Sequence, residues 1–166
     1  WEGKRKAAIR AVDEEGRKRV IRDSYTGTVE TVNTEFLRGL LAQGMIPVLT
    51  PPAISVDGEA INVDGDRAAA RTAAALGAEE LLLLSNVPGL LANFPDESSL
   101  VRELPFGEID AAMEMAQGRM RIKLLGAREA LEGGVRSVTL GDARNENAIR
   151  SARAGGGTTV LMEVKA

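Results

Sequence analysis

The chain contains 166 residues, carries a formal net charge of −3 and has an average share of apolar residues, so it can form about one folded domain. It has no cysteine, which excludes disulfide bonds and thiolate chemistry and fits a cytoplasmic protein. It also has no histidine, which excludes a Ser-His-Asp triad and a histidine general base within these residues. The acidic balance argues against a general nucleic-acid binder, and the longest apolar run, residues 81–84, is too short to cross a membrane.

The N-terminal segment is strongly basic. Residues 4–12 and 17–23 alternate between apolar and charged side chains on either side of the turn at residues 13–16, and this pattern predicts a β-hairpin. Its cationic side chains are Lys4, Arg5, Lys6, Arg10, Arg17, Lys18, Arg19 and Arg22. Two interpretations are open: a solvated edge that resists aggregation, or a docking surface for an acidic partner.

The next segment predicts a helix followed by short β elements. Residues 34–43 have apolar side chains at helical spacing, with Asn33 as the N-cap and Gly44 as the C-terminal stop. We expect residues 46–49 to form a short buried strand and residues 54–61 to form a second hairpin.

The rest of the chain alternates between helices and strands. We expect helices over residues 64–76, 106–115, 119–131 and 145–152, strands over residues 80–85, 137–140 and 158–162, and a loop over residues 91–106. This alternation predicts an α/β fold with a mainly parallel central sheet sandwiched by helices, and the basic hairpin as an excursion near the N-terminus.

A polar cluster precedes the helix over residues 64–76. Asn62, Asp64 and Asp66 alternate along the chain, so on an extended backbone they would share one face. An aspartate at a helix start also caps the first N–H groups and complements the helix dipole. Capping accounts for one of the three residues but not for all of them, so a functional site and a plain cap are equally consistent with the spacing.

Two further features occupy positions at which α/β proteins bind ligands. The strand over residues 80–85 runs into the polar turn Ser85-Asn86-Val87-Pro88-Gly89, and open α/β sheets bind their ligands beyond the carboxyl ends of strands. Lys123 follows the break at Gly118 by about one helical turn, near a helix start that attracts phosphate. Each feature alone also fits a structural turn or a solvated lysine.

Taken together, these motifs resemble the amino acid kinase family, and within it the acetylglutamate kinase branch. The matching residues occur in family order: Asn62, Asp64 and Asp66 in INVDGDRAAA, Leu82–Leu90 in LLLSNVPGL, Gly118–Lys123 in GRMRIK, and Gly157-Thr158. The segments DSYTGTVETVN, PVLTPPA and AQGRMRIKLLGA more closely resemble the carrier-protein-dependent aminoadipate/glutamate kinases of lysine biosynthesis. The resemblance implies the three-layer α/β fold of that family.

The resemblance also implies an activity. Such enzymes transfer the γ-phosphoryl group of ATP, bound with Mg²⁺, to the side-chain carboxylate of an N-blocked acidic amino acid and form an acyl phosphate. The amino acid is 2-aminoadipate or glutamate attached to a small acidic carrier protein, which is a candidate partner for the basic hairpin. A homodimer is implied by resemblance alone, and no residue is assigned as a metal ligand.

The resemblance assigns roles to individual residues. Lys123 corresponds to the lysine that neutralises charge on the transferring phosphoryl group, Asp66 to the aspartate that orients the catalytic lysines, and Asn62 to the asparagine that hydrogen-bonds the substrate. The nucleotide-side turn consists of Ser85, Asn86, Val87, Pro88 and Gly89.

The resemblance divides the chain after residue 58. Residues 1–58 correspond to a remnant of the amino-acid-substrate lobe, including the basic hairpin, and residues 59–166 correspond to the nucleotide-binding lobe. The opening strand of the family, with its lysine and paired glycines, is not found in this sequence. We therefore expect the C-terminal part of such an enzyme, which by itself binds ATP weakly at most and does not turn over.

Three other functions are left open. Within the family, the alternative is an N-acetylglutamate kinase of arginine biosynthesis. A second alternative is a nucleotide-sensing α/β domain without catalysis, although the presence of both Lys123 and Asp66 speaks against it. The third is a structural domain in which all the motifs are caps and turns.

Overall fold

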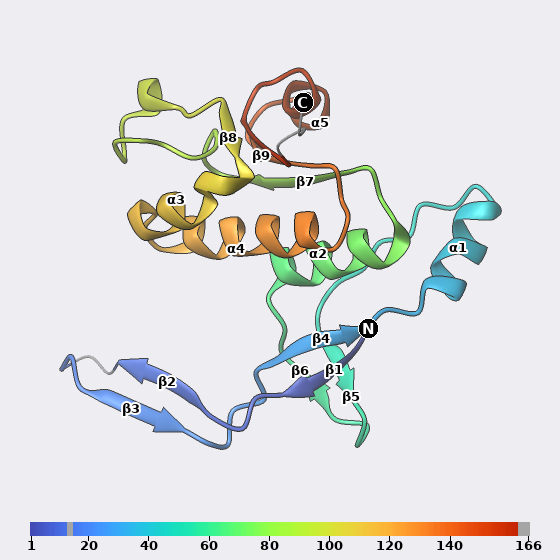
Figure 1. Ribbon diagram of the computed structural model, residues 1–166. Helices are drawn as coiled ribbons and strands as arrows, with labels where there is room; N and C mark the ends of the chain where they lie inside the picture. Colours follow the sequence, from blue (N-terminus) through green and yellow to red (C-terminus); the bar gives the residue numbers. More distant parts are fainter. Residues whose placement is uncertain (13–14, 163–166) are drawn as a thin grey trace. The chain divides into compact units, whose positions relative to one another are not determined.

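The computed structural model describes residues 1–12 and 15–162, and the chain separates into two compact units, Trp1–Ala68 and Ala69–Ala166 (Figure 1). Helix α2 (Gly65–Leu76) begins in the first unit and ends in the second. The division lies after residue 68, whereas the sequence places the lobe boundary after residue 58. The assignment of the two parts to substrate and nucleotide remains a prediction.

The first unit is built on a four-stranded sheet with the order β4-β1-β5-β6. Its strands are β1 (Glu2–Arg5), β4 (Gly27–Thr31), β5 (Ala53–Ser55) and β6 (Ala60–Ile61). Strand β1 pairs with β4 antiparallel and with β5 parallel, and β5 and β6 form the second hairpin that the sequence predicts. Ile61 in the edge strand β6 is fully buried. Its side chain packs closely against two glycines of β1 and β4, since a Cβ atom at Gly3 or Gly27 would lie 2.9 or 2.8 Å from its Cδ1 atom.

The basic hairpin is present but shorter than expected. Strands β2 (Ile9–Val12) and β3 (Lys18–Ile21) pair antiparallel and form a two-stranded sheet of their own. Lys4 and Arg5 belong instead to β1, where their backbone pairs with β4 and does not extend the hairpin. The expected turn residues Asp13 and Glu14 lie outside the described residues.

Helix α1 (Thr34–Ala42) confirms the predicted helix and its N-cap, since the Asn33 side chain accepts a hydrogen bond from the backbone N–H of Phe36 at 3.0 Å. The expected buried strand over residues 46–49 is wrong. No strand is assigned there, and the side chains of Ile46 and Val48 are 88% and 86% exposed. The physical reason is that no strand in the described part of the chain pairs with this segment, so its apolar residues have nothing to pack against.

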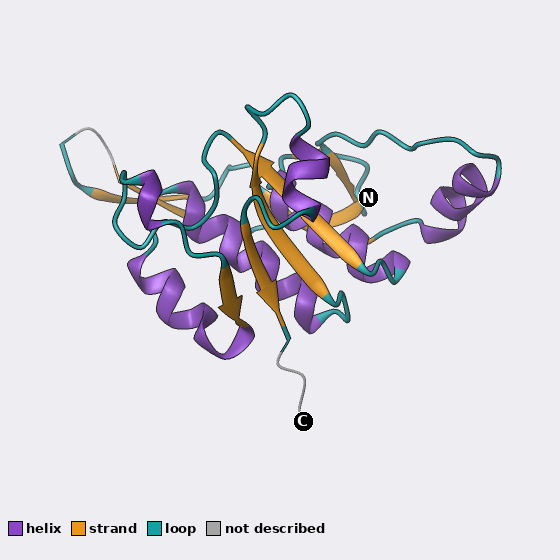
Figure 2. Ribbon diagram, turned by 90° about the horizontal axis from the view of Figure 1, so that it is seen from above, coloured by secondary structure: helices purple, strands orange, loops and turns teal. Residues whose placement is uncertain are grey.

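The second unit contains a four-stranded sheet with the order β7-β9-β10-β8 (Figure 2). Its strands are β7 (Glu80–Ser85), β8 (Glu103–Pro105), β9 (Ser137–Asp142) and β10 (Thr158–Leu161). The pairs β7/β9 and β8/β10 are parallel, and β9/β10 is antiparallel. Strand β8 lies inside the predicted loop over residues 91–106, because three residues are too few to show a period in the sequence.

Three further helices complete the second unit: α3 (Ile109–Met115), α4 (Arg119–Glu132) and α5 (Ala148–Arg153). Helix α4 covers one face of the sheet, and α5 covers the other face (Figures 1 and 2). The buried side chains of Leu83, Leu124, Val138 and Val160 join the sheet and α4 in one apolar core. The predicted α/β class is therefore confirmed, and two of the three strand pairs of this sheet are parallel, as expected. The sheet of the first unit is not mainly parallel, because two of its three pairs are antiparallel. No helix within the described residues is long and apolar enough to cross a membrane.

Candidate functional site

Asn62 is held by backbone hydrogen bonds beside the segment that precedes β4. Its N–H donates to the carbonyl of Tyr25 at 2.7 Å, and its carbonyl accepts from the N–H of Gly27 at 2.8 Å. The neighbouring side chains of Ile61 and Val63 are buried in the core of the first unit, so the alternation along an extended backbone leaves the Asn62 side chain exposed. The structure thus presents the predicted substrate-binding amide to solvent from a rigid backbone.

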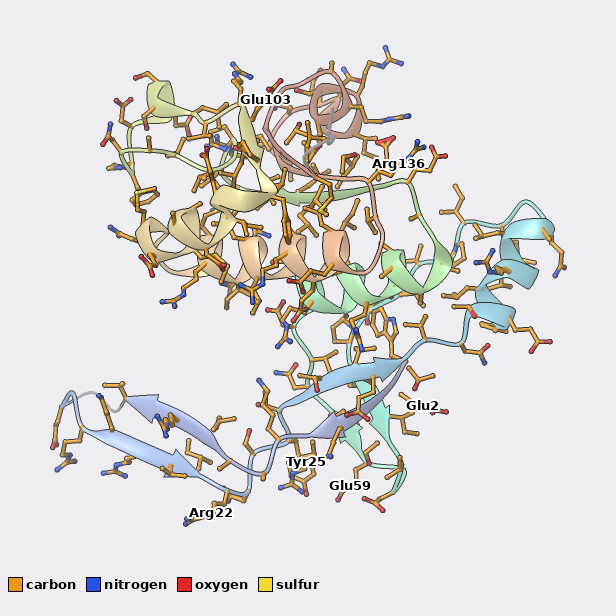
Figure 3. All side chains as sticks on the ribbon, in the orientation of Figure 1. Glu2, Arg22, Tyr25, Glu59, Glu103 and Arg136 are labelled. Atoms are coloured by element: carbon orange, nitrogen blue, oxygen red, sulfur yellow. The ribbon has the colours of Figure 1, made fainter. Side chains whose placement is uncertain are left out.

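The segment next to Asn62 is itself anchored. Arg5 Nε donates to the carbonyl of Ser24 at 2.7 Å, and its guanidinium lies 4.2 Å from the ring centroid of Tyr25. Arg5 also forms an ion pair with Glu59 at 3.6 Å, so it contacts both Tyr25 and Glu59, which are labelled in Figure 3. The Ser24 hydroxyl donates to Thr26 Oγ1 at 2.8 Å. These contacts hold the backbone around Tyr25, to which the backbone of Asn62 is hydrogen-bonded.

The polar cluster before α2 divides into different roles. Asp64 is the N-cap, because its Oδ1 atom accepts from the N–H of Arg67 at 3.1 Å and its carbonyl accepts from Ala68 at 2.9 Å. Asp66 lies in the first turn of α2 and is half-buried. Asp66 does not share an extended face with Asn62, because the helix begins at Gly65.

In the second unit, the predicted nucleotide-side turn leaves the sheet next to the end of β9. Ser85 is in register with Asp142 in the parallel β7/β9 pair, and the N–H of Ala143 donates to the Ser85 carbonyl at 2.6 Å. Two carboxyl ends of parallel strands therefore meet at one edge of the sheet, which is where α/β proteins bind their ligands.

Thr158 holds the other end of this turn. Its side chain is fully buried, and its hydroxyl accepts from the N–H of Leu90 at 2.8 Å and donates to the carbonyl of Val101 at 2.6 Å. A Cβ atom at Gly89 would lie 2.5 Å from Thr158 Oγ1, so only glycine permits this close approach. The turn is thus locked at Ser85 and at Gly89.

Lys123 lies in the second turn of α4 and is only 8% exposed, which excludes the interpretation as a solvated lysine. The helix follows Gly118, whose φ of 55° places it in the left-handed region, and its first turn has no side-chain cap. A buried ammonium group is screened less by water and interacts more strongly with an anion than an exposed one does. The position of Lys123 therefore suits a role in neutralising the charge of a bound anion.

The same edge of the sheet carries an ionic cluster that the sequence did not indicate. The guanidinium of Arg144 donates to both carboxylate oxygens of Asp142, from Nε to Oδ1 at 2.9 Å and from Nη2 to Oδ2 at 2.7 Å. Nη2 also donates to Glu97 Oε1 at 3.0 Å. The Asp142 side chain is only 10% exposed. Asp142 ends a buried strand as Ser85 does, so the rule of strand ends offered a signal for it.

The Arg144 hydrogen bonds hold the pKa of Asp142 below its usual value, against the opposing effect of burial. A carboxyl whose pKa is lower in the folded state stabilises the fold above the usual aspartate pKa, and this contribution is lost as the pH falls below that value and through the lowered pKa of the folded state. We expect Asp142→Asn to be less stable than the wild type near pH 7 and to lose less stability as the pH falls from about 5 to about 2. Urea unfolding at several pH values measures this, and parallel pH dependences for the two proteins would contradict it.

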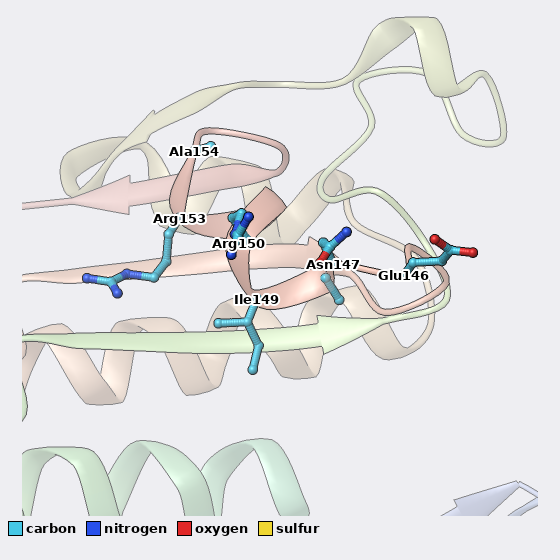
Figure 4. Close-up of a pocket in the computed structure, with 7 residues that line it drawn as sticks. Glu146, Asn147, Ile149, Arg150, Arg153 and Ala154 are labelled. Carbon is cyan, nitrogen blue, oxygen red and sulfur yellow. The ribbon is translucent and has the colours of Figure 1, made fainter.

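A pocket of about 830 Å³ lies over α5 and the residues before it (Figure 4). It is lined by Glu146, Asn147, Ala148, Ile149, Arg150, Arg153 and Ala154. None of the predicted site residues lines it, and all its residues come from one continuous segment. We assign no ligand to this pocket.

The predicted site residues are distributed over both units. Lys123 and the Ser85–Gly89 turn belong to the second unit, where α4 and β7 share one core, and Asn62 and Asp66 belong to the first unit. Within the described residues, no group of three or more Asp or Glu side chains gathers in a way that could hold a metal ion.

The sequence model of the amino acid kinase family matches residues 4–142 of this chain, and this range includes every predicted site residue. The chain belongs to the amino acid kinase family. It is 58% identical over 160 residues to a LysW-aminoadipate kinase of Deinococcus radiodurans, a match that covers 96% of this chain and 54% of that protein. It is 55% identical over 160 residues to a LysW-aminoadipate kinase of Thermus thermophilus, covering 95% of this chain and 59% of that protein.

More distant relatives of this kinase-family chain include an acetylglutamate kinase of Pelotomaculum thermopropionicum, 36% identical over 137 residues and covering 81% of this chain and 46% of that protein. The chain thus spans about half the length of the curated relatives it matches. The resemblance to the family and to its LysW-dependent subgroup is confirmed.

Solved structures support the same fold. The crystal structure of N-acetylglutamate synthase from Neisseria gonorrhoeae with coenzyme A and L-arginine is similar, with a TM-score of 0.77, 28% identity and coverage of 99% of this chain and 38% of that chain. Carbamate kinase from Giardia lamblia bound to AMP-PNP has a TM-score of 0.69 at 22% identity, covering 94% of this chain and 52% of that chain. The second likeness concerns the fold alone.

Proposed function

We propose that the protein containing this chain transfers the γ-phosphoryl group of ATP to the side-chain carboxylate of carrier-linked 2-aminoadipate or glutamate and forms an acyl phosphate. The observation that carries the proposal is the 58% identity over 160 residues to a LysW-aminoadipate kinase. The family match includes Asn62, Asp66, the Ser85–Gly89 turn and Lys123.

The residues of this chain suit such a reaction. Phosphoryl transfer to an already ionised carboxylate needs positioning and charge neutralisation rather than a strong base, which agrees with the absence of histidine. In the proposal, Lys123 neutralises the transferring group, Asp66 orients the catalytic lysines, and the exposed Asn62 amide hydrogen-bonds the substrate. The Ser85–Gly89 turn lies along the nucleotide.

Mg²⁺ enters this proposal only as part of the ATP complex. The described residues gather no set of carboxylates for a metal ion of their own, and Mg²⁺ commonly binds through substrate phosphates. The chemistry it supplies when bound is the neutralisation of phosphate charge. The cytoplasmic location and the homodimer remain predictions.

The proposal is tested by assaying the full-length protein with ATP and each of three acceptors: carrier-linked 2-aminoadipate, carrier-linked glutamate and N-acetylglutamate. Hydroxylamine captures an acyl phosphate as a hydroxamate, which can be counted. We expect hydroxamate with a carrier-linked acceptor. Product from N-acetylglutamate alone would favour the alternative that the 36% identity to an acetylglutamate kinase supports. ATP binding without any product would favour a nucleotide sensor. The isolated 166-residue chain is expected to form no product.

The basic hairpin offers a surface for an acidic carrier. In its register, Arg10 faces Val20 and Val12 faces Lys18, so these four side chains share one face. The two valines are 66% and 55% exposed between the cations. An apolar centre flanked by positive charge suits a small acidic protein that docks by both kinds of contact.

We expect Arg10→Glu/Lys18→Glu to raise the KM for the carrier-linked substrate about tenfold or more, because two attractive charges become repulsive. The KM for ATP should not change, and the effect should shrink as the salt concentration rises. The matched control is Arg136→Glu/Arg150→Glu, which changes the net charge equally on the second unit. Equal effects of the two double variants would contradict docking on the hairpin.

A further inference from the structure

The loop that follows the nucleotide-side turn is a closed unit with its own internal contacts. Leu91 and Leu100 form an antiparallel bridge at its base, and the N–H of Val101 donates to the carbonyl of Leu90 at 2.9 Å. Near its tip, Asp96 caps the short turn at residues 97–99 by accepting from the N–H of Ser98 at 2.9 Å. The loop therefore keeps its own shape, and its orientation depends on how its base and its tip are attached to the sheet.

Two side chains attach this loop to the sheet. Thr158 binds the base, where its hydroxyl contacts both Leu90 and Val101. Arg144 binds the tip, where its guanidinium joins Glu97 to Asp142. Asp142 is in register with Ser85, the first residue of the nucleotide-side turn, so the second attachment ends beside the site.

We propose that Arg144 is a positioning residue for nucleotide binding: it ties the tip of the 90–101 loop to the end of β9 and thereby orients the Ser85–Gly89 turn. This inference rests on the proposed kinase function. Arg144 acts through Asp142 and Glu97 and is not assigned a contact with ATP. A guanidinium suits this task because its planar fork binds one carboxylate with two hydrogen bonds and still offers a donor to a second.

Arg144 also balances charge at this edge of the sheet. It is the shared partner of two carboxylates, so its removal would leave Asp142 and Glu97 facing each other without a cation between them. Uncompensated carboxylates near the nucleotide-side turn would repel the phosphates of ATP. Removal of Arg144 would weaken ATP binding through loss of the loop orientation, through loss of the charge balance, or through both. A substitution of Glu97 distinguishes these two effects.

The test measures nucleotide binding by the full-length protein, through the KM for ATP in steady-state kinetics and the Kd for the analogue AMP-PNP in a direct titration. We expect Arg144→Ala to raise the KM and the Kd for the nucleotide about tenfold, with kcat and the KM for the acceptor changed less than about threefold. Arg144→Lys should recover only part of the loss, because an ammonium cannot reproduce the two-pronged contact. Arg136→Ala, which removes the exposed ion pair to Glu79 at 2.7 Å, is the matched control and should leave the nucleotide constants unchanged.

Glu97→Ala keeps the inference falsifiable if Arg144→Ala does not fold, because Glu97 is exposed and the Asp142–Arg144 pair survives its loss. This variant removes a negative charge. Charge balance alone predicts tighter ATP binding, whereas loop orientation predicts a KM for ATP that rises several-fold. Unchanged or tighter nucleotide binding in Glu97→Ala would overturn the positioning role. If both variants bind ATP as the wild type does and Lys123→Met still lowers kcat strongly, the inference fails while the proposed function stands.

Discussion

Lys123→Met is expected to lower kcat of the full-length protein by about 10²–10³-fold, because it removes a cation that the proposed mechanism places on the transferring phosphoryl group. Methionine preserves the apolar stem of a side chain that is 8% exposed, so the fold of α4 should persist. Hydroxamate formation with saturating ATP and acceptor measures the effect, and circular dichroism confirms that the variant is folded.

The control for this prediction lies on the same helix. Arg121 is exposed one half-turn earlier in α4, and Arg121→Met removes an equal charge without touching the buried position. We expect this control to retain kcat within about threefold, as is usual for a surface substitution. Full activity of Lys123→Met would remove the lysine from the mechanism and favour a non-catalytic role for the domain.

The second large effect is expected at Gly89, where the fold rather than the chemistry is affected. A Cβ atom there would lie 2.5 Å from Thr158 Oγ1 and 2.9 Å from the Thr158 backbone nitrogen. Because the obstacle includes backbone, a rotamer change cannot relieve it, and the turn or β10 must move. We expect Gly89→Ala to lower the free energy of unfolding by about 1–3 kcal/mol and to weaken AMP-PNP binding.

The matched control is Gly39→Ala, which adds the same methyl group inside α1. No atom lies within 4 Å of the added Cβ at Gly39. Alanine favours a helix over glycine by about 1 kcal/mol, so the control should be neutral or stabilising. Urea unfolding and AMP-PNP titration compare the two variants. A Gly89→Ala protein as stable as Gly39→Ala would show that the close approach to Thr158 does not hold the turn.

Local patterns predicted the elements whose formation depends on neighbouring residues. The apolar spacing and the Asn33 cap were sufficient for α1, since the cap contacts an N–H only three residues away. The same holds for α2 and α4, which appear close to their predicted bounds. The order of the motifs was sufficient for the family, because it depends on residue identity and spacing alone.

Strands depend on a distant partner, and the sequence predicted those with a clear apolar run, such as β7, β9 and β10. Residues 46–49 have the composition of a buried strand, but a strand also needs a neighbour to pair with, and the described residues supply none. Strand β8 shows the opposite case, in which three residues without a period become a strand through pairing with β10. The composition of a segment indicates whether it favours a strand, and the presence of a pairing strand decides whether that strand forms.

The candidate site shows the same division. The sequence alone was sufficient to show that Asn62, Asp66, Ser85–Gly89 and Lys123 occur in the order of the amino acid kinase family. The burial of Lys123 and the attachment of the loop after the turn by Thr158 and Arg144 became visible only in the folded chain. The physical reason is range: Thr158 reaches Leu90 across 68 positions and Arg144 reaches Glu97 across 47, and contacts of that separation leave no trace in a local pattern.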